Sequence, residues 1–392
     1  MTIYIASLAT IMILGLLMMI NNYFIIVDEV TQKEFIISPY NVGLCSDTLS
    51  KTSVRPWWIY PYNTFIITEN TPENILSTLD VVIMPRTEQR LCWDTPVFRE
   101  LVSLKKHNKA RPMMLYLSGE VFNSGTRTTC NHLDAVIYRS LEEQQAGCPT
   151  IHFLQAISHE KQRYNEKTKY YPSEIDTLPK PEPRKKFCAL ITRTVFRRTH
   201  YKAIDALVRH GLVKLLSEYK QCERPKCVGT DLDSHKCMQK YKFVITMENT
   251  SEKGYFSEKL LNGALSNTMP IYFGAKNIQS YVNTERFVWC RVNNTFLSDI
   301  RQFYQRPYFY FDQFDKQNQP VDDELINWIT EKIRLPMKTC IDQIIKLDRD
   351  DELYEKKRSK SIWNENKEYY VSGQYERNQL DSVIKKYKQE WS

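Results

Sequence analysis

The sequence predicts an α/β protein in which two parallel-sheet domains follow an N-terminal apolar helix. Short runs of β-branched and aromatic residues alternate with helical patterns in both halves of the chain, as expected where crossover helices join parallel strands. A proline-rich, charged stretch at residues 170–186 separates the halves and is typical of a linker. The 392 residues are enough for two domains of ordinary size after an anchor.

Residues 3–27 are the expected anchor. The stretch contains no charged residue, and as a helix it would be about 37 Å long, enough to span a bilayer with some tilt. No small-x-small cleavage site follows, so we expect an uncleaved signal-anchor, with a cleaved signal peptide as the alternative. The orientation stays open because no lysine or arginine precedes the span.

The first domain is assigned to residues 35–169 and the second to residues 187–350, and residues 351–392 form a charged tail with helical potential at 379–391. A helix is expected at 97–106 in the first domain. The expected strands of that domain are apolar runs at 35–37, 65–68, 81–84, 113–118, 135–138 and 151–153.

Residues 241–274 are the most informative stretch, because they read as strand, loop, helix and strand. Phe243, Ile245 and Met247 would share one face of the first strand, and Ser257 can cap the helix. Ligands of such βαβ units lie beyond the carboxyl ends of the strands, at a helix N-terminus that favours phosphate. The stretch therefore predicts a nucleotide-sugar site. The side chains expected there are those of Glu248, Asn249, Tyr255, Glu258 and Lys259.

Lys259 lies in the first turn of the expected helix. A cation at a helix start opposes the helix dipole, which favours an anionic partner such as a leaving pyrophosphate. An ordinary solvated surface lysine is the alternative.

The spacing of these residues resembles the donor motif of the α1,3/4-fucosyltransferases, glycosyltransferase family 10. The motif stands here as Glu248-Asn249-Thr250, then Tyr255-Phe256-Ser257-Glu258-Lys259, with a later Pro270 and Gly274. Met247 replaces the usual phenylalanine, a hydrophobic exchange that should leave the site intact. The resemblance implies a GT-B fold, in which two Rossmann-like domains face a cleft and bind the acceptor and GDP-fucose respectively. A C-terminal helix often crosses back to the first domain in that fold, so the tail either does this or is frayed.

A second match lies upstream, where a strand at 187–192 leads into a basic loop. The family uses an arginine followed four residues later by tyrosine to hold the donor diphosphate, and Arg197 with Tyr201 has that spacing. A guanidinium suits this role because it binds phosphate in a bidentate manner. Arg198 is the other candidate for binding the diphosphate. Thr192-Arg193 stands where the family has a Ser-Asn pair. A surface loop without a binding role is the alternative interpretation.

Glu120 is the expected general base. It follows a strand at 112–118, and the family carries a glutamate at such a position, followed by a segment similar to Tyr138-Arg139-Ser140. Displacement at an anomeric carbon needs a carboxylate within hydrogen-bond reach of the acceptor hydroxyl. Without the resemblance of the surrounding segments to the family, Glu120 would be interpreted as an ordinary loop glutamate.

The resemblance implies an inverting transfer of L-fucose from GDP-fucose to a GlcNAc hydroxyl, most simply in α1,3 linkage, on glycoprotein or glycolipid glycans. Glu120 would take the proton, Arg197 and Lys259 would neutralise the leaving GDP, and no catalytic metal would be needed. The DxD triplets at 231–233 and 348–350 are weak matches to a metal motif. A transferase for another nucleotide sugar and a membrane-tethered, glycan-binding pseudoenzyme are the alternatives. The family also implies a type II Golgi membrane protein with a lumenal catalytic domain.

Ten cysteines fit an oxidising, lumenal compartment. Cys222, Cys227, His235 and Cys237 do not have zinc-site spacing. The family's cysteine positions imply local pairing among Cys222, Cys227 and Cys237, and pairing of Cys290 with Cys340.

The net charge of +8 does not indicate nucleic-acid binding, because the basic residues do not cluster with interleaved aromatic residues. Two glycosylation sequons begin at Asn249 and Asn293. A glycan at Asn249 would block the donor motif, so only Asn293 is an expected acceptor.

Overall fold

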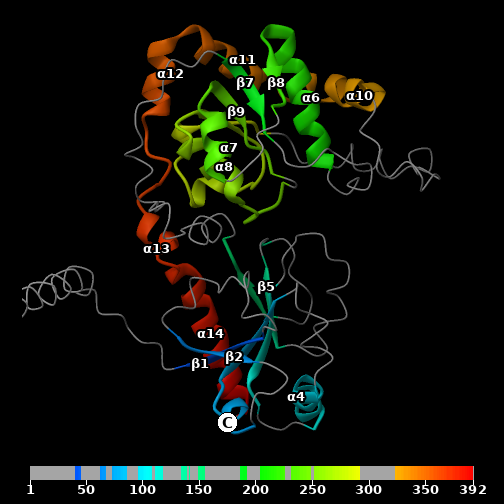
Figure 1. The fold of residues 1–392 in the computed structure, drawn as a ribbon, viewed down its shortest axis with the longest axis vertical. Coiled ribbons are helices and arrows are strands. Elements are labelled where there is room, and N and C mark those ends of the chain that lie inside the picture. The colour runs from blue at the N-terminus through cyan, green and yellow to red at the C-terminus, as the bar shows by residue number, and fades with distance from the viewer. Residues whose placement is uncertain are drawn as a thin grey trace, which may run out of the picture.

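A computed structural model describes residues 40–45, 62–67, 73–85, 96–107, 111–117, 134–138, 141, 149–154, 186–191, 204–225, 231–248, 251–291 and 323–391. It contains two parallel sheets, one from each half of the chain (Figure 1). The expected α/β class is therefore confirmed. Residues 3–27 lie outside the described residues, and no described helix is long and apolar enough to cross a membrane.

The first sheet has the strand order β2-β1-β3-β4-β5-β6. Helices α2 (Glu73–Leu76) and α4 (Pro96–Lys106) belong to this half. Five of its strands coincide with predicted runs, because buried parallel strands are nearly continuous apolar segments. The strands are β1 (Asn41–Cys45), β2 (Asn63–Ile67), β3 (Val81–Pro85), β4 (Met113–Leu117), β5 (Ala135–Tyr138) and β6 (Thr150–His152).

Strand β1 is absent from the predicted strands, and the expected strand at 35–37 lies outside the described residues. The sequence of β1, NVGLC, includes an asparagine and a glycine, which are both depleted in strands. The glycine suits the packing, since a Cβ on Gly43 would lie 2.4 Å from Ile67 Cδ1 and 2.8 Å from Leu79 Cδ1, and these side chains would have to shift. The same residue therefore weakens the sequence signal and fits the interior position of β1 between β2 and β3.

The second sheet has the strand order β11-β10-β9-β7-β8. Phe243, Ile245 and Met247 share one core cluster, as predicted, with residues from the helices on that side of the sheet. The strands are β7 (Lys186–Leu190), β8 (Cys222–Glu223), β9 (Tyr241–Ile245), β10 (Met269–Tyr272) and β11 (Val288–Trp289). The helices are α6 (Ile204–Tyr219), α7 (Asp231–Met238), α8 (Glu258–Leu265), α10 (Asp323–Arg334), α11 (Lys338–Arg349) and α12 (Asp351–Arg358), with the 3-10 turns η6 (Ile278–Ser280) and η7 (Thr284–Arg286).

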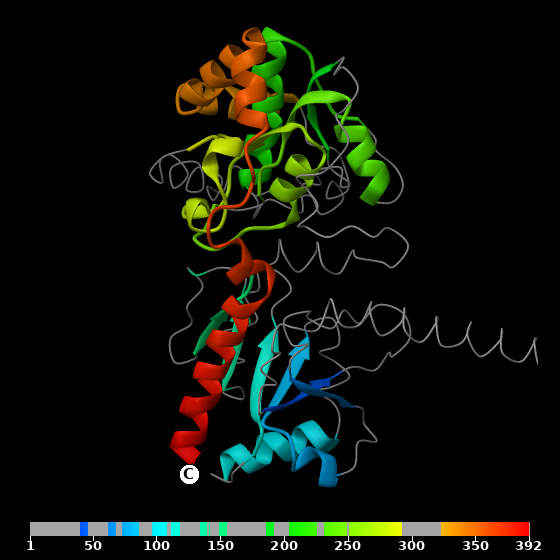
Figure 2. The same cartoon turned by 90° about the vertical axis from the view of Figure 1, so that its left-hand side faces the viewer.

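Within the tail at 351–392, α12 packs on the second half. Beyond it the chain forms α13 (Lys367–Val371) and α14 (Gln374–Trp391), and α14 runs along the first sheet (Figures 1 and 2). Leu380 and Ile384 are both 0 % exposed and share a core cluster with residues of β1, β3, β4 and β5. Tyr62 also donates to Asp381 Oδ1 at 2.9 Å. Of the two outcomes expected for the tail, the helix that crosses back is the one observed.

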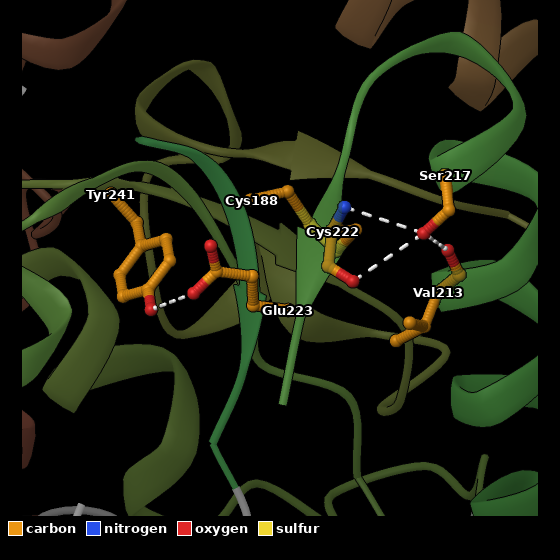
Figure 3. The surroundings of a disulfide bond; sticks show 6 residues. All are labelled: Cys188, Val213, Ser217, Cys222, Glu223 and Tyr241. Carbon is orange, nitrogen blue, oxygen red and sulfur yellow. Dashed lines mark hydrogen bonds between the residues drawn. A yellow bond between two sulfur atoms is a disulfide. The ribbon is translucent and has the colours of Figure 1, made fainter. Parts of the chain in front are cut away.

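Two disulfides join pairs of described cysteines in the second half. Cys290 pairs with Cys340, as predicted. Local pairing of Cys222 is wrong, because Cys222 bonds to Cys188 (Figure 3). The reason is the register of the sheet: β7 and β8 are adjacent parallel strands, and Cys188 lies directly opposite Cys222. Cys237 is also disulfide-bonded.

Hydrogen bonds on both sides hold this disulfide at the edge strand β8. Ser217 Oγ in α6 accepts from Cys222 N at 3.3 Å and donates to Val213 O at 2.7 Å, and Tyr241 donates to Glu223 Oε2 at 2.7 Å (Figure 3). Glu223 also pairs with Lys186 Nζ at 2.7 Å. The short strand is thus fastened to the sheet covalently and by polar contacts.

Candidate functional site

The candidate site lies where β9 and β10 end and α8 begins. Sheet-like pairing continues beyond β9, since Thr246 N donates to Ile271 O at 2.8 Å and Glu248 N donates to Phe273 O at 2.7 Å. Glu248 is therefore held by its backbone at the carboxyl edge of the sheet. In open α/β sheets this edge is where ligands bind.

The Glu248 carboxylate is 0 % exposed and is held by the start of α8. Its Oε1 accepts from Ser257 N at 2.9 Å, and its Oε2 accepts from Ser257 Oγ at 2.5 Å and lies 3.4 Å from Lys259 Nζ. Ser257 has the N-cap position but makes no side-chain cap, so the predicted capping role is wrong. Glu248, which follows β9, performs the capping role instead, because its carboxylate accepts from a backbone N–H at the helix start.

Burial raises the pKa of the Glu248 carboxyl above its ordinary value. The charge of Lys259 and the hydrogen bonds from Ser257 lower this pKa, whereas the nearby Glu258 raises it. A buried carboxylate persists as an anion only where a cation and donors compensate for lost hydration. The ionisation of Glu248 is therefore coupled to Lys259.

Lys259 connects this buried carboxylate to the surface. Its Nζ donates to Ser257 Oγ at 2.9 Å, and its side chain is 27 % exposed. The pairing explains why a lysine is tolerated where the helix dipole opposes it. The remaining exposure leaves part of the side chain available to an anion, so Lys259 differs from a fully solvated surface lysine.

Gly274 is required by the side chains that meet behind the site. A Cβ there would lie 2.4 Å from Glu248 Cγ and 2.6 Å from the Tyr272 hydroxyl. Ser251 Oγ donates to Gly274 O at 2.9 Å, and Tyr272 accepts from Ala275 N at 2.9 Å. Burial, with a smaller contribution from the Glu248 charge, raises the pKa of Tyr272 well above its ordinary value.

The structure describes four of the predicted site residues and brings two of them, Glu248 and Lys259, into contact. Tyr255 is 3 % exposed and directly precedes the helix start, while Glu258 is half-buried as the first residue of α8. Glu120, Arg197, Tyr201 and Asn249 lie outside the described residues.

The residues that hold the loop at 251–257 have no role predicted from the sequence. Gly254 has a φ of +81°, and its N–H donates to Asn277 Oδ1 at 2.7 Å. Lys253 O accepts from Leu141 N, a residue of the first half, at 2.7 Å. A glycine between Lys253 and Tyr255 was the available signal, since glycine favours positive φ.

The first DxD triplet, at 231–233, lies at the start of α7, and two aspartates of the second have structural contacts. Asp231 begins α7, and Asp348 accepts from the Tyr219 hydroxyl at 3.1 Å. Asp350 caps α12 by accepting from Leu353 N at 2.9 Å. Within the described part of the chain, no group of histidine, cysteine and acidic residues is placed to hold a metal ion.

Comparison with known proteins links this site to one family. Residues 181–296 match the model of "Glycosyltransferase family 10 (fucosyltransferase) C-term". An α-(1,4)-fucosyltransferase of Arabidopsis thaliana is 39 % identical over 74 residues, which is 18 % of each chain. An α-(1,3)-fucosyltransferase of Helicobacter pylori is 37 % identical over 51 residues, covering 13 % of this chain and 11 % of that one. The matches thus span less than a fifth of the length of either relative.

A similar overall fold occurs in a solved structure. The crystal structure of an α1,3-fucosyltransferase with GDP has a TM-score of 0.51 at 14 % identity, over 88 % of this chain and 90 % of that one. Identity at this level supports the similarity of the fold alone.

Proposed function

We propose that this protein is an inverting fucosyltransferase that uses GDP-fucose, because residues 181–296 match the glycosyltransferase family 10 model. The acceptor is a GlcNAc hydroxyl of glycoprotein or glycolipid glycans, and the linkage is α1,3. The observation that carries the proposal is the Glu248–Ser257–Lys259 cluster at the start of α8, where a partly exposed ammonium is fixed by a buried carboxylate.

In the proposed reaction, the acceptor oxygen attacks the anomeric carbon of fucose from the side opposite GDP. The hydroxyl proton passes to Glu120, and the electron pair of the breaking C–O bond goes to the β-phosphate of GDP. Arg197 and Lys259 stabilise the charge that develops on the diphosphate. One displacement gives inversion, so no covalent intermediate is needed.

Glu248 acts on the donor indirectly, through Lys259. With no exposed surface it is suited to orienting Ser257 and Lys259, not to touching the donor. An ammonium held in place before the reaction loses less freedom on binding phosphate than a mobile one. Asn249, Tyr255 and Glu258 complete the donor site in this proposal.

We propose that catalysis needs no metal. The second DxD triplet supports this, because Asp348 and Asp350 are already engaged by protein groups. We also propose that residues 3–27 anchor the protein in the Golgi membrane with the catalytic part in the lumen. The disulfides support this location, since they form in oxidising compartments.

The test is a transfer assay with the full-length protein in detergent, with EDTA present, using GDP-fucose and a panel of N-acetyllactosamine and N-glycan acceptors. We expect fucose transfer to at least one acceptor. Lys259→Ala should reduce kcat/KM by about 10²–10³-fold, while Lys253→Ala, an exposed lysine on the same loop, should have little effect. Glu120→Gln should bind GDP-fucose but lose transfer.

Four outcomes would contradict parts of the proposal. Failure to bind GDP-fucose would overturn the donor assignment, and preferential binding of another nucleotide sugar would replace it. Donor binding without transfer to any acceptor would favour a pseudoenzyme. Equal losses in Lys259→Ala and Lys253→Ala would remove the specific role of Lys259.

A further inference from the structure

Three distant segments of the chain meet at His152, the last residue of β6. Its side chain is wholly buried at 0 % exposure. The Nε2 atom lies 3.0 Å from Gly254 O, in the loop before α8, and Nδ1 lies 2.7 Å from the Tyr375 hydroxyl, at the start of α14. One imidazole therefore joins the first sheet, the loop of the candidate site and the C-terminal helix.

The chemistry of the partners fixes where the protons are. The Gly254 carbonyl can only accept, so Nε2 must carry a hydrogen. In the neutral ring Nδ1 then accepts from Tyr375. Burial raises the pKa of Tyr375, which keeps this hydroxyl protonated and able to donate. The result is a directed chain from the Tyr375 hydroxyl through the imidazole to the Gly254 carbonyl.

The backbone of His152 is held as firmly as its ring. Its N–H donates to Gln379 Oε1 at 2.9 Å, and its carbonyl accepts from Gln379 Nε2 at 3.1 Å. Leu154 N donates to Glu376 Oε1 at 3.2 Å, one turn before Gln379 on α14. These bonds attach the end of β6 to α14, so His152 presents its ring from a fixed position.

The loop fits closely against this ring. A Cβ on Gly254 would lie 2.4 Å from His152 Nε2, and the φ of +81° already favours glycine there. Two residues after Gly254, Phe256 stacks on Tyr281 with ring centroids 6.3 Å apart and planes at 8°. Tyr281 is in turn 6.1 Å from the His152 ring. The loop therefore has little room to move while His152 is in place.

The loop leads directly to the candidate site, because Gly254 is followed by Tyr255 and, three residues on, by Ser257, whose N–H and hydroxyl hold Glu248. We propose that His152 is a positioning residue, which seats the loop at 251–257 so that Tyr255, Ser257 and Lys259 are arranged for the donor. This inference rests on the proposed use of GDP-fucose. It places a determinant of donor binding in the first half of the chain, outside the family 10 segment.

Three substitutions separate this role from simple packing. His152→Phe keeps a ring but removes both hydrogen bonds. His152→Gln can return an amide N–H to about the place of Nε2, and should preserve the bond to Gly254 O. Tyr387→Phe is the matched control, because Tyr387 lies on α14 and donates to Arg111 O at 3.3 Å, so it loses a contact between α14 and the first half away from the loop.

We expect His152→Phe to raise the Kd of GDP-fucose about tenfold, because the loop loses its buried hydrogen bond from His152 Nε2 to Gly254 O. His152→Gln should stay within about threefold of the wild type, and Tyr387→Phe should not change the Kd. If His152→Phe fails to fold, Tyr375→Phe takes its place with a smaller rise. Unchanged Kd in the folded His152 and Tyr375 variants, with lower thermal stability alone, would overturn the inference.

Hydrogen exchange of the amides at 251–257 provides a readout that does not depend on the proposed reaction. We expect faster exchange of these amides in His152→Phe, recovery in His152→Gln and no change in Tyr387→Phe. If the wild type does not bind GDP-fucose, the proposed function fails while this measurement still tests the loop. Unchanged exchange in His152→Phe would overturn the positioning role itself.

Discussion

The two sheets of this protein acquire their cores differently. The second sheet is covered by helices of its own half, with Leu212 of α6, Ile333 of α10 and Ile344 of α11 in one cluster with β7, β9 and β10. The first sheet depends on α14, which follows the whole second half in sequence and supplies Leu380 and Ile384. Sequence distance therefore does not decide which half a helix stabilises, and the tail is a structural part of the first half.

The largest effect should come from the helix that crosses back. Leu380→Ala removes a fully buried side chain and should reduce the free energy of unfolding by about 2–5 kcal/mol. Denaturant titration followed by hydrogen exchange should locate the loss in β1 to β6. Ile333→Ala, equally buried in the second core, should weaken β7 to β11 instead.

Leu335→Ala is the surface control, since Leu335 is 80 % exposed and its truncation should change the free energy by no more than about 0.5 kcal/mol. If Leu380→Ala and Ile333→Ala weakened the same strands, the two cores would not be separate units.

The disulfide at the edge of the second sheet should have the next largest effect. Replacing Cys188 and Cys222 together by alanine opens a loop with a sequence separation of 34 and should cost about 3 kcal/mol. The loss should appear in exchange of β7 and β8 and leave the contacts of α14 intact. Equal weakening of β1 to β6 would show that the halves unfold as one unit.

Lys259→Met should destabilise the second half by about 1–3 kcal/mol near neutral pH, because it leaves the buried Glu248 without its cation. The pKa of folded Glu248 is already raised, so the folded state holds its proton more strongly than the unfolded state does. The contribution of this group to stability therefore falls as pH rises through the interval between the two pKa values.

Removing Lys259 should raise the pKa of Glu248 further and widen that interval. Thermal unfolding of Lys259→Met across pH 4 to 8 should show the smallest difference from wild type at the acid end. Adding Glu248→Gln should recover part of the loss at neutral pH. A deficit that did not vary with pH would separate Lys259 from the ionisation of Glu248.

The smallest effect concerns Lys357 at the end of α12. Burial lowers the pKa of its ammonium to about 8, although Nζ donates to Glu285 O at 2.9 Å. Because the folded pKa lies below the ordinary value of 10.5, this group adds stability as pH rises from about 8 toward that value. Lys357→Met should therefore raise the melting temperature slightly at pH 7 and lose this advantage above pH 9. A lower melting temperature at pH 7 would mean that its hydrogen bond outweighs its burial.

The sequence predicted most strands, and the position of Glu248, because these signals are local. Runs such as residues 113–118 and 241–247 carry enough apolar residues to be recognised without partners, and Glu248, which follows the second run, lies at the expected edge of the sheet. Strand β1 was not predicted, because the reason for its glycine is contact with Ile67 and Leu79, which are distant in sequence.

The missed features depend on pairing between segments. Cys188 faces Cys222 only through the register of β7 and β8, and Ser257 turned from a cap to a donor because Glu248 reaches it from another element. The sequence around His152 does not indicate a functional role, because this residue ends a short strand of otherwise ordinary composition. Its role follows from Gly254 and Tyr375, which lie 102 and 223 residues away.

The position of α14 also bears on how the chain folds during synthesis. The ribosome makes the first sheet early, yet Leu380 and Ile384 are synthesised only after the whole second sheet. Since domains generally fold as they are synthesised, N-terminal first, we expect this protein to depart from the usual order. The half made first should wait, with an apolar face uncovered, until α14 has been synthesised. Chaperone dependence and sensitivity to C-terminal fusion tags should therefore be concentrated in the N-terminal half.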